Sequence, residues 1–297
     1  REYPIFENSP LLQPRNDYAS GTHRLLLRLV ALNVIVLIGA GFASYLLARR
    51  TLEPIEAAHE QQKRFTADVS HELRTPLTAL RMESEVALLN DKAPASALRA
   101  TLTSNLEEVG KLEVLINNLL RLTRLEANEL QQQFEPVNTE ALAAAALERV
   151  EPLAKVQKIK LASDIPTAAI NGDQDSLAQL LVILLDNAIK YSPKGAEVNL
   201  QGRQRGEQFI FTVTDHGQGI APDALKHVFD RFYRANSART KDGQEGYGLG
   251  LSIAKMIADL HDGNITLSSR VDHGTTATVT LPARADVAPP PAPAAVQ

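Results

Sequence analysis

The sequence contains no cysteine and no tryptophan, and aromatic residues make up only 5% of its 297 residues. Without cysteine the chain cannot form disulfide bonds or metal sites with thiolate ligands. The formal net charge is -4, so the chain also lacks the basic excess of nucleic-acid-binding proteins, and no direct nucleic-acid contact is expected. The length suffices for one medium domain and a smaller one.

Charged residues are scarce in one apolar segment of 23 residues, from Leu25 to Leu47, where Arg28 is the only one. Such a run is long enough to cross a bilayer. A buried core helix is the alternative, but few core helices are this long without a polar face. The pattern predicts a transmembrane helix at 25–48. A cleavable signal peptide is disfavoured, because 24 polar or mixed residues precede the apolar run.

The next part of the chain is helical in pattern. Residues 49–64 remain compatible with a juxtamembrane helix despite Pro54, and apolar spacing predicts two long helices at 55–90 and 95–129. The turn between them is Asn-Asp-Lys-Ala-Pro at 90–94. A hairpin with one apolar stripe on each helix buries those stripes poorly by itself. We therefore expect an all-α dimerisation hairpin that forms a four-helix bundle in a homodimer.

After Pro136 the pattern changes to alternating short strands and helices, which indicates an α+β sandwich domain. Strands are predicted at 159–163, 168–171, 197–203, 208–214, 264–269 and 275–281, and helices at 139–157, 174–191, 222–227 and 249–261. The tail at 284–297 is rich in proline and alanine and is expected to be disordered.

Residues 71–76 read His-Glu-Leu-Arg-Thr-Pro within the first long helix. At about 100° per residue, His71 lies opposite the apolar stripe, and Thr75 follows one turn later on the same face. Pro76 lacks an N–H, so the helix should bend just past the histidine. A lone exposed histidine is usually only solvated. The adjacent carboxylate and the nearby hydroxyl nevertheless favour a chemical role.

Two further segments carry groups suited to a nucleotide. The helix at 174–191 ends with Asp186, Asn187, Lys190 and Tyr191. An amide oxygen can ligate Mg²⁺, and a lysine can neutralise phosphate. The strand at 208–214 then leads into Asp-His-Gly-Gln-Gly, whose carboxylate could accept the amino group of adenine. This second pattern is weak by itself, since many hairpin turns resemble it.

A glycine-rich segment, Gly-Tyr-Gly-Leu-Gly-Leu at 246–251, precedes a helix, and its backbone N–H groups and helix dipole suit phosphates. A dinucleotide-binding fingerprint has a different glycine spacing and follows a strand, whereas this segment follows a polar stretch. That stretch, 235–246, is expected to be a mobile lid. Phe-Asp-Arg-Phe-Tyr-Arg at 229–234 comes just before it.

Taken in order, these segments resemble the phosphoacceptor and ATP-binding boxes of bacterial membrane-bound sensor histidine kinases of two-component systems. The resemblance covers about residues 50–283. It implies a dimerisation and phosphoacceptor domain at 65–131 and a catalytic ATP-binding domain at 136–283, of the fold shared with gyrase, Hsp90 and MutL. Residues 1–24 would be the remnant of an extracytoplasmic sensor region. Because the chain begins with Arg1, it is expected to be part of a longer protein.

The resemblance also implies roles. His71 would be phosphorylated, with Glu72 as its base or electrostatic partner and Thr75 orienting water for dephosphorylation. Asn187 would hold Mg²⁺, and Asp215 would read the adenine of ATP. The remaining nucleotide contacts would come from Lys190, Tyr191, Gly217, Gly219, Gly246, Gly248, Gly250 and Leu251.

The implied protein is an enzyme of the bacterial inner membrane with its catalytic part in the cytoplasm. It would autophosphorylate from Mg-ATP and transfer the phosphate to an aspartate of a cognate response regulator. Thr75 implies phosphatase activity toward that regulator as well.

The sequence departs from the family pattern at two positions. Ile183 stands where the family often has Asn, His or Glu, and His216 replaces the more usual Asn. No HAMP-type linker fits before His71. The departure at Ile183 leaves open a protein of the same fold that acts mainly as a phosphatase or as an ATP-responsive binding module. An ATPase of the gyrase or MutL type is disfavoured by the helical hairpin and the apolar run.

Overall fold

The computed structural model describes residues 17–89, 94–126, 134–235 and 246–283, with the side chains of 17–23, 54, 57 and 61 left aside. The segments 1–16, 90–93, 127–133, 236–245 and 284–297 lie outside the described residues. They hold most of the predicted sensor remnant, the hairpin turn, the lid and the tail. The chain divides into two compact units, Arg1–Ala67 and Asp68–Gln297.

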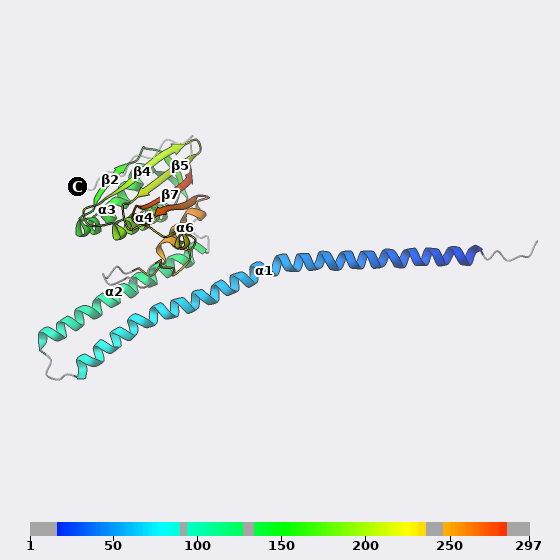
Figure 1. Ribbon diagram of the computed structural model, residues 1–297, viewed down its shortest axis with the longest axis horizontal. Coiled ribbons are helices and arrows are strands. Elements are labelled where there is room, and N and C mark those ends of the chain that lie inside the picture. The colour runs from blue at the N-terminus through cyan, green and yellow to red at the C-terminus, as the bar shows by residue number, and fades with distance from the viewer. Residues whose placement is uncertain (1–16, 90–93, 127–133, 236–245, 284–297) are drawn as a thin grey trace, which may run out of the picture. The chain divides into compact units, whose positions relative to one another are not determined.

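One helix, α1 (Asp17–Leu89), includes the whole apolar run and continues without interruption through Pro54 and Pro76 (Figure 1). The segment 49–64, predicted to be compatible with a helix despite Pro54, is part of this helix. The most apolar window of α1 has a mean hydropathy of 2.3 and is not buried by any other part of the protein. By length and composition, this helix could cross a membrane. The bend expected at Pro76 stays a prediction.

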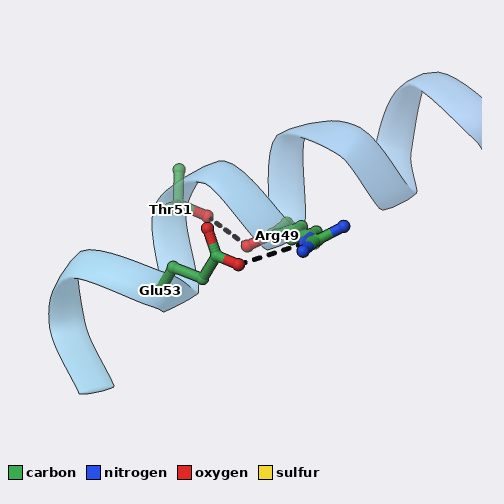
Figure 2. Close-up of polar contacts among 4 residues, drawn as sticks. Arg49, Thr51 and Glu53 are labelled. Atoms are coloured by element: carbon green, nitrogen blue, oxygen red, sulfur yellow. Dashed lines mark hydrogen bonds and ion pairs between the residues drawn. The ribbon is translucent and has the colours of Figure 1, made fainter. Parts of the chain in front are cut away.

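Just beyond the apolar run, α1 carries polar side chains that bond within the helix (Figure 2). The Nε of Arg49 lies 3.1 Å from the Oε1 of Glu53, one turn further along. The hydroxyl of Thr51 donates to the carbonyl oxygens of Leu47 and Ala48, each at 3.0 Å. Such local pairs satisfy polar groups without a partner chain, so the helix can continue past the apolar run.

The end of α1 and helix α2 (Ala95–Glu126) form the predicted hairpin. Polar side chains join the two helices, because Ser104 donates to Glu83 at 3.2 Å and Asn105 donates to Ser84 at 3.1 Å. Many apolar side chains of the hairpin remain exposed in the single chain. They are Leu77, Met82, Val86, Leu88, Leu89, Leu98, Leu102, Leu106, Val109, Val114, Ile116 and Leu120.

The remainder of the second unit contains a five-stranded sheet in the order β2-β4-β5-β7-β6 (Figure 1). Strand β2 is parallel to β4, and the other neighbours are antiparallel. The bounds are β2 Lys160–Asp164, β4 Glu197–Arg205, β5 Gln208–Thr214, β6 Asn264–Arg270 and β7 Gly274–Pro282. A second sheet pairs β1 (Glu135–Asn138) with β3 (Ala169–Gly172).

Helices α3 (Thr139–Gln157), α4 (Gln174–Tyr191) and α6 (Gly250–Leu260) pack with the large sheet, and α5 (Pro222–Leu225) is a single short turn. The alternate residues of β5 that face the helices are apolar and buried, among them Phe209 and Phe211. Helix α4 supplies the densest apolar contribution, including Leu181 and Leu185. Burial of this apolar surface is the main stabilising force of the domain.

The predicted α+β sandwich is therefore confirmed, and each strand and helix predicted after Pro136 lies within a few residues of an observed one. Strand β1 was missed. It is only four residues long and contains Pro136, which removes a backbone donor and lowers the expectation of a strand. Its pairing with β3 places this strand beside the start of α4.

Candidate functional site

His71 is exposed on α1, as the helical spacing predicted. Thr75 is also exposed, and its hydroxyl donates to the backbone carbonyl of His71 at 3.2 Å. Glu72 is half-buried, and Pro76 is buried. The arrangement presents the imidazole to solvent with a carboxylate beside it and a hydroxyl one turn away.

The end of α4 contributes the polar groups expected from its sequence. The ammonium of Lys190 lies 2.6 Å from the carboxylate of Asp186, and both side chains are about two-thirds buried. The amide of Asn187 is half-buried and makes no hydrogen bond with any described residue. Tyr191 is 49% exposed. Asn187 thus has an uncommitted oxygen that could bind a cation, beside a lysine already held in place.

Asp215 stands at the end of β5, where the backbone fixes one of its oxygens. Its Oδ1 accepts the N–H of Gly217 at 2.8 Å and the N–H of Thr275 at 3.1 Å. Its Oδ2 accepts no hydrogen bond from a described residue. The side chain is buried, with 9% exposed. Asp215 is therefore a rigid carboxylate with one free acceptor, which is the geometry needed to bind an amino group.

Burial raises the pKa of Asp215 above its ordinary value of 3.8. The two backbone hydrogen bonds and the neighbouring His216 act in the opposite direction but do not overcome that burial. The raised pKa means that the two backbone hydrogen bonds offset only part of the cost of burying the ionised carboxylate. This cost is typical of a residue kept for binding.

The loop after Asp215 closely approaches the end of α4. A Cβ at Gly217 would lie 2.3 Å from the carbonyl oxygen of Tyr191, so no larger residue fits there. The N–H of Gln218 donates to the same oxygen at 3.3 Å. The residues predicted from two separate motifs are therefore neighbours in the fold.

The glycine-rich segment contacts α4 and the backbone of Phe232. A Cβ at Gly250 would lie 3.3 Å from the side chain of Ile183, which is buried on α4. Gly248 has a φ of 69°, which a glycine adopts readily, and its carbonyl accepts the N–H of Phe232 at 3.0 Å. No atom of the described residues lies within 4 Å of a Cβ at Gly246. Ile183 thus faces the proposed phosphate loop with an apolar side chain.

The β6–β7 turn contributes to the site, and the motifs did not reveal it. Thr275 supplies one of the two donors to Asp215, and a Cβ at Gly274 would lie 2.0 Å from the Asp215 carbonyl oxygen. The only sequence signal was a glycine in a short turn between two predicted strands, a pattern too common to indicate a site.

Two family models match the chain at the places where these groups lie. The first, described as the His Kinase A (phospho-acceptor) domain, matches residues 61–128, which include His71. The second, described as the Histidine kinase-, DNA gyrase B-, and HSP90-like ATPase, matches residues 172–285. The chain belongs to the sensor histidine kinases. In this histidine kinase both matched regions follow the apolar part of α1.

The relatives with known names agree with this family assignment. The histidine kinase chain is 33% identical to the sensor histidine kinase RppB of Synechocystis sp. over 88% of its length and 58% of RppB. It is 37% identical to the sensor-like histidine kinase SenX3 of Mycobacterium bovis over 74% of its length and 53% of SenX3. It therefore spans little more than half the length of these relatives. The structure of full-length ShkA in complex with AMPPNP shares 28% identity, with a TM-score of 0.57, over 75% of this chain and 46% of ShkA.

Proposed function

We propose that this chain autophosphorylates His71 from Mg-ATP and transfers the phosphate to an aspartate of a response regulator. The observation that carries the proposal is the exposed His71, within a phosphoacceptor domain, on the same chain as a nucleotide-binding fold with an open acceptor at Asp215. The complex of ShkA with AMPPNP, an ATP analogue, supports the same ligand here.

The phosphoryl transfer needs an unprotonated ring nitrogen on His71 as the nucleophile. That nitrogen attacks the γ-phosphorus, an N–P bond forms, the bond to the bridging oxygen breaks, and ADP leaves. The product imidazole carries positive charge at its other nitrogen, and the carboxylate of Glu72 offsets that charge or accepts the proton. Because phosphoryl transfer depends mainly on alignment and charge neutralisation, the histidine must be accessible to a donor domain.

For the nucleotide, the free Oδ2 of Asp215 would accept the amino group of adenine, and Gly217 and Gly219 would line the pocket. Lys190 would meet phosphate charge, although it must share its ammonium with Asp186. Tyr191 is exposed enough to contact the base or ribose. Backbone N–H groups at Gly246, Gly248, Gly250 and Leu251, near the start of α6, would bind the phosphates.

The residues present fit a magnesium ion. Mg²⁺ is usually held by one or two protein oxygens together with phosphates and water, and the uncommitted amide oxygen of Asn187 is one such ligand. When bound, the ion would neutralise phosphate charge during the transfer.

The exposed apolar side chains of the hairpin support a homodimer. Contiguous exposed apolar surface on two adjacent helices is costly in water, and a second copy of the hairpin would cover it in a four-helix bundle. This assembly presents His71 on the outside of the bundle, where both a donor domain and a regulator can reach it.

The apolar part of α1 supports an inner-membrane location with the catalytic part in the cytoplasm. None of its most apolar window is buried in the described structure, and it has the length and composition of a membrane span. Following the predicted boundaries, we assign 25–48 to the membrane and 65–131 and 136–283 to the phosphoacceptor and catalytic domains.

The test is a transfer assay on the purified full chain. With γ-³²P-ATP and Mg²⁺, the chain should gain a label that is stable to alkali and lost in acid. The label should then move to a receiver-domain protein encoded by a neighbouring gene. Sustained release of free phosphate with no labelled protein would contradict the proposal and favour an ATPase.

Ile183 favours a second candidate, in which the same fold acts mainly as a phosphatase of the regulator. This apolar side chain is buried beside Gly250 and offers no polar group to a nucleotide there. Thr75 suits that activity, because its hydroxyl hydrogen is bound to the His71 carbonyl and its lone pairs can accept a hydrogen bond from an attacking water. Rates of autophosphorylation and of regulator dephosphorylation, measured side by side, separate the two candidates.

A further inference from the structure

The hydroxyl of Ser269, near the end of β6, is fully used in a hydrogen-bond network. It accepts the N–H of Ile220 at 2.8 Å and donates to the carbonyl of Gly274 at 2.9 Å. The hydroxyl of Thr275 lies 2.8 Å away and can donate to it. A serine hydroxyl offers one donor and two acceptor positions, and all three are taken here. The side chain is half-buried, so water cannot freely replace these bonds.

The partners of Ser269 belong to the two segments that hold Asp215. Thr275 supplies its N–H to the Oδ1 of Asp215 at 3.1 Å and accepts the Asp215 N–H at its own carbonyl at 2.9 Å. Ile220 ends the loop in which Gly217 supplies the other N–H at 2.8 Å. Ser269 therefore ties the β6–β7 turn to the loop after β5, and Asp215 lies between the two.

The β6–β7 turn packs closely against the backbone of Asp215. A Cβ at Gly274 would lie only 2.0 Å from the Asp215 carbonyl oxygen, so the backbones are in direct contact. Any shift of the turn would therefore move the donor that fixes Oδ1. The direction of the free Oδ2 would change with it.

We infer that Ser269 is a positioning residue for nucleotide-base recognition: its hydroxyl locks the turn and the loop together so that Oδ2 of Asp215 is aimed at the amino group of adenine. This inference rests on the proposed function. Ser269 does not touch the nucleotide itself. Its effect should therefore be confined to the part of the binding energy that depends on the base.

The readout is the preference for ADP over inosine diphosphate, which carries a carbonyl oxygen in place of the adenine amino group. Neither nucleotide can donate a phosphate to His71, so binding is measured without turnover. We would titrate the full chain in detergent micelles with each nucleotide and Mg²⁺ by calorimetry. The dissociation constant of inosine diphosphate divided by that of ADP gives the preference for adenine. This ratio reports how well Oδ2 of Asp215 is aimed.

Ser269→Ala should reduce this ratio by about five- to tenfold, mainly through weaker ADP binding, as expected when a hydrogen bond is misaligned. Ser269→Cys keeps the approximate size, but a thiol forms only weak hydrogen bonds, so this variant should reduce the ratio too. It replaces the alanine variant in the test if that variant does not fold. Ser269→Thr keeps the hydroxyl and should preserve the ratio. Ser268→Ala, on the exposed neighbour in β6, is the matched control and should leave it unchanged.

An equal loss of ADP and inosine diphosphate binding in Ser269→Ala and Ser269→Cys, or no loss in either, would overturn the inference. Asp215→Asn separates this failure from a failure of the proposed function. If Asp215→Asn collapses the ratio while the Ser269 variants retain it, only the role of Ser269 is refuted. If Asp215→Asn retains the ratio, Asp215 does not read adenine, and both claims fall.

Discussion

Asp215→Asn should weaken nucleotide binding and at the same time stabilise the nucleotide-free protein. Oδ1 of Asp215 accepts two backbone N–H groups, and an asparagine can keep both bonds by placing its own Oδ1 there. The amide nitrogen then takes the place of Oδ2. It would direct an N–H group toward the amino group of adenine, so a hydrogen bond is lost and two donors face each other.

The size of the binding loss follows from the charge on the acceptor. A hydrogen bond to a charged group contributes about 1.5–3 kcal/mol, so ADP should bind about 10- to 150-fold more weakly. The stability change has the opposite sign. Because burial raises the pKa of Asp215, its ionised form costs free energy at neutral pH, and a neutral amide removes that cost. We expect a gain on the order of 1 kcal/mol, as is common when a strained functional residue is replaced.

Calorimetric titration with ADP measures the first effect, and thermal unfolding without nucleotide, followed by circular dichroism, measures the second. Asp223→Asn is the matched control, because it removes the same charge from a fully exposed position. ADP binding within twofold of the unmodified chain would refute base recognition by Asp215. Loss of affinity together with lower nucleotide-free stability would show that Asp215 is a structural residue.

Three other changes have defined outcomes. Ile183→Asn should raise the autophosphorylation rate about tenfold, because it supplies a polar contact beside Gly250. Ile183→Val is the control, and an unchanged rate in Ile183→Asn would show that this position does not face the nucleotide. Thr75→Ala should lower dephosphorylation of the regulator more than tenfold while autophosphorylation persists, and equal losses would contradict a role in positioning water. The buried His261 accepts the N–H of Asp173 at 3.1 Å and lies 2.7 Å from the Ile257 carbonyl, and burial lowers its pKa from 6.5 despite the carboxylates of Asp173 and Asp262. Below about pH 6.5 the unfolded chain binds a proton that the folded chain does not, so the free energy of unfolding should fall as pH falls, by up to about 1.4 kcal/mol per pH unit. Urea unfolding across this range measures the slope, and an unchanged slope in His261→Gln would assign it to other groups.

Periodicity predicted most of this fold because the longer elements of the catalytic part, such as α4, α6, β4 and β5, each have a buried apolar face. Helix α4 combines ten buried residues with a polar end, and β5 alternates between the two environments. Strand β1 was not predicted, because its four residues alone do not indicate a strand. Its structure depends on pairing with β3. Helix α1 continues through Pro54, as the helical pattern of 49–64 allowed, although a proline usually marks a helix boundary.

Residues of the candidate site were predictable where their type and neighbouring sequence indicate a chemical role. His71, Asn187 and Asp215 belong to recognisable patterns, and the fold brings the segment of Asp215 beside the end of α4. The supporting residues were not predictable in this way. Ser269 acts through backbone groups about 50 positions earlier in the chain, and no local pattern records such a contact. Whether each named residue has its expected role stays a prediction.

The most direct test of the account is phosphorylation of His71→Gln compared with the unmodified chain. Both proteins would be incubated with γ-³²P-ATP and Mg²⁺, and ADP binding would be measured in parallel. The account predicts that the variant gains no acid-labile label and binds ADP with unchanged affinity, because His71 lies outside the nucleotide-binding residues. Undiminished acid-labile labelling of His71→Gln would contradict the assignment of His71 as the phosphoacceptor.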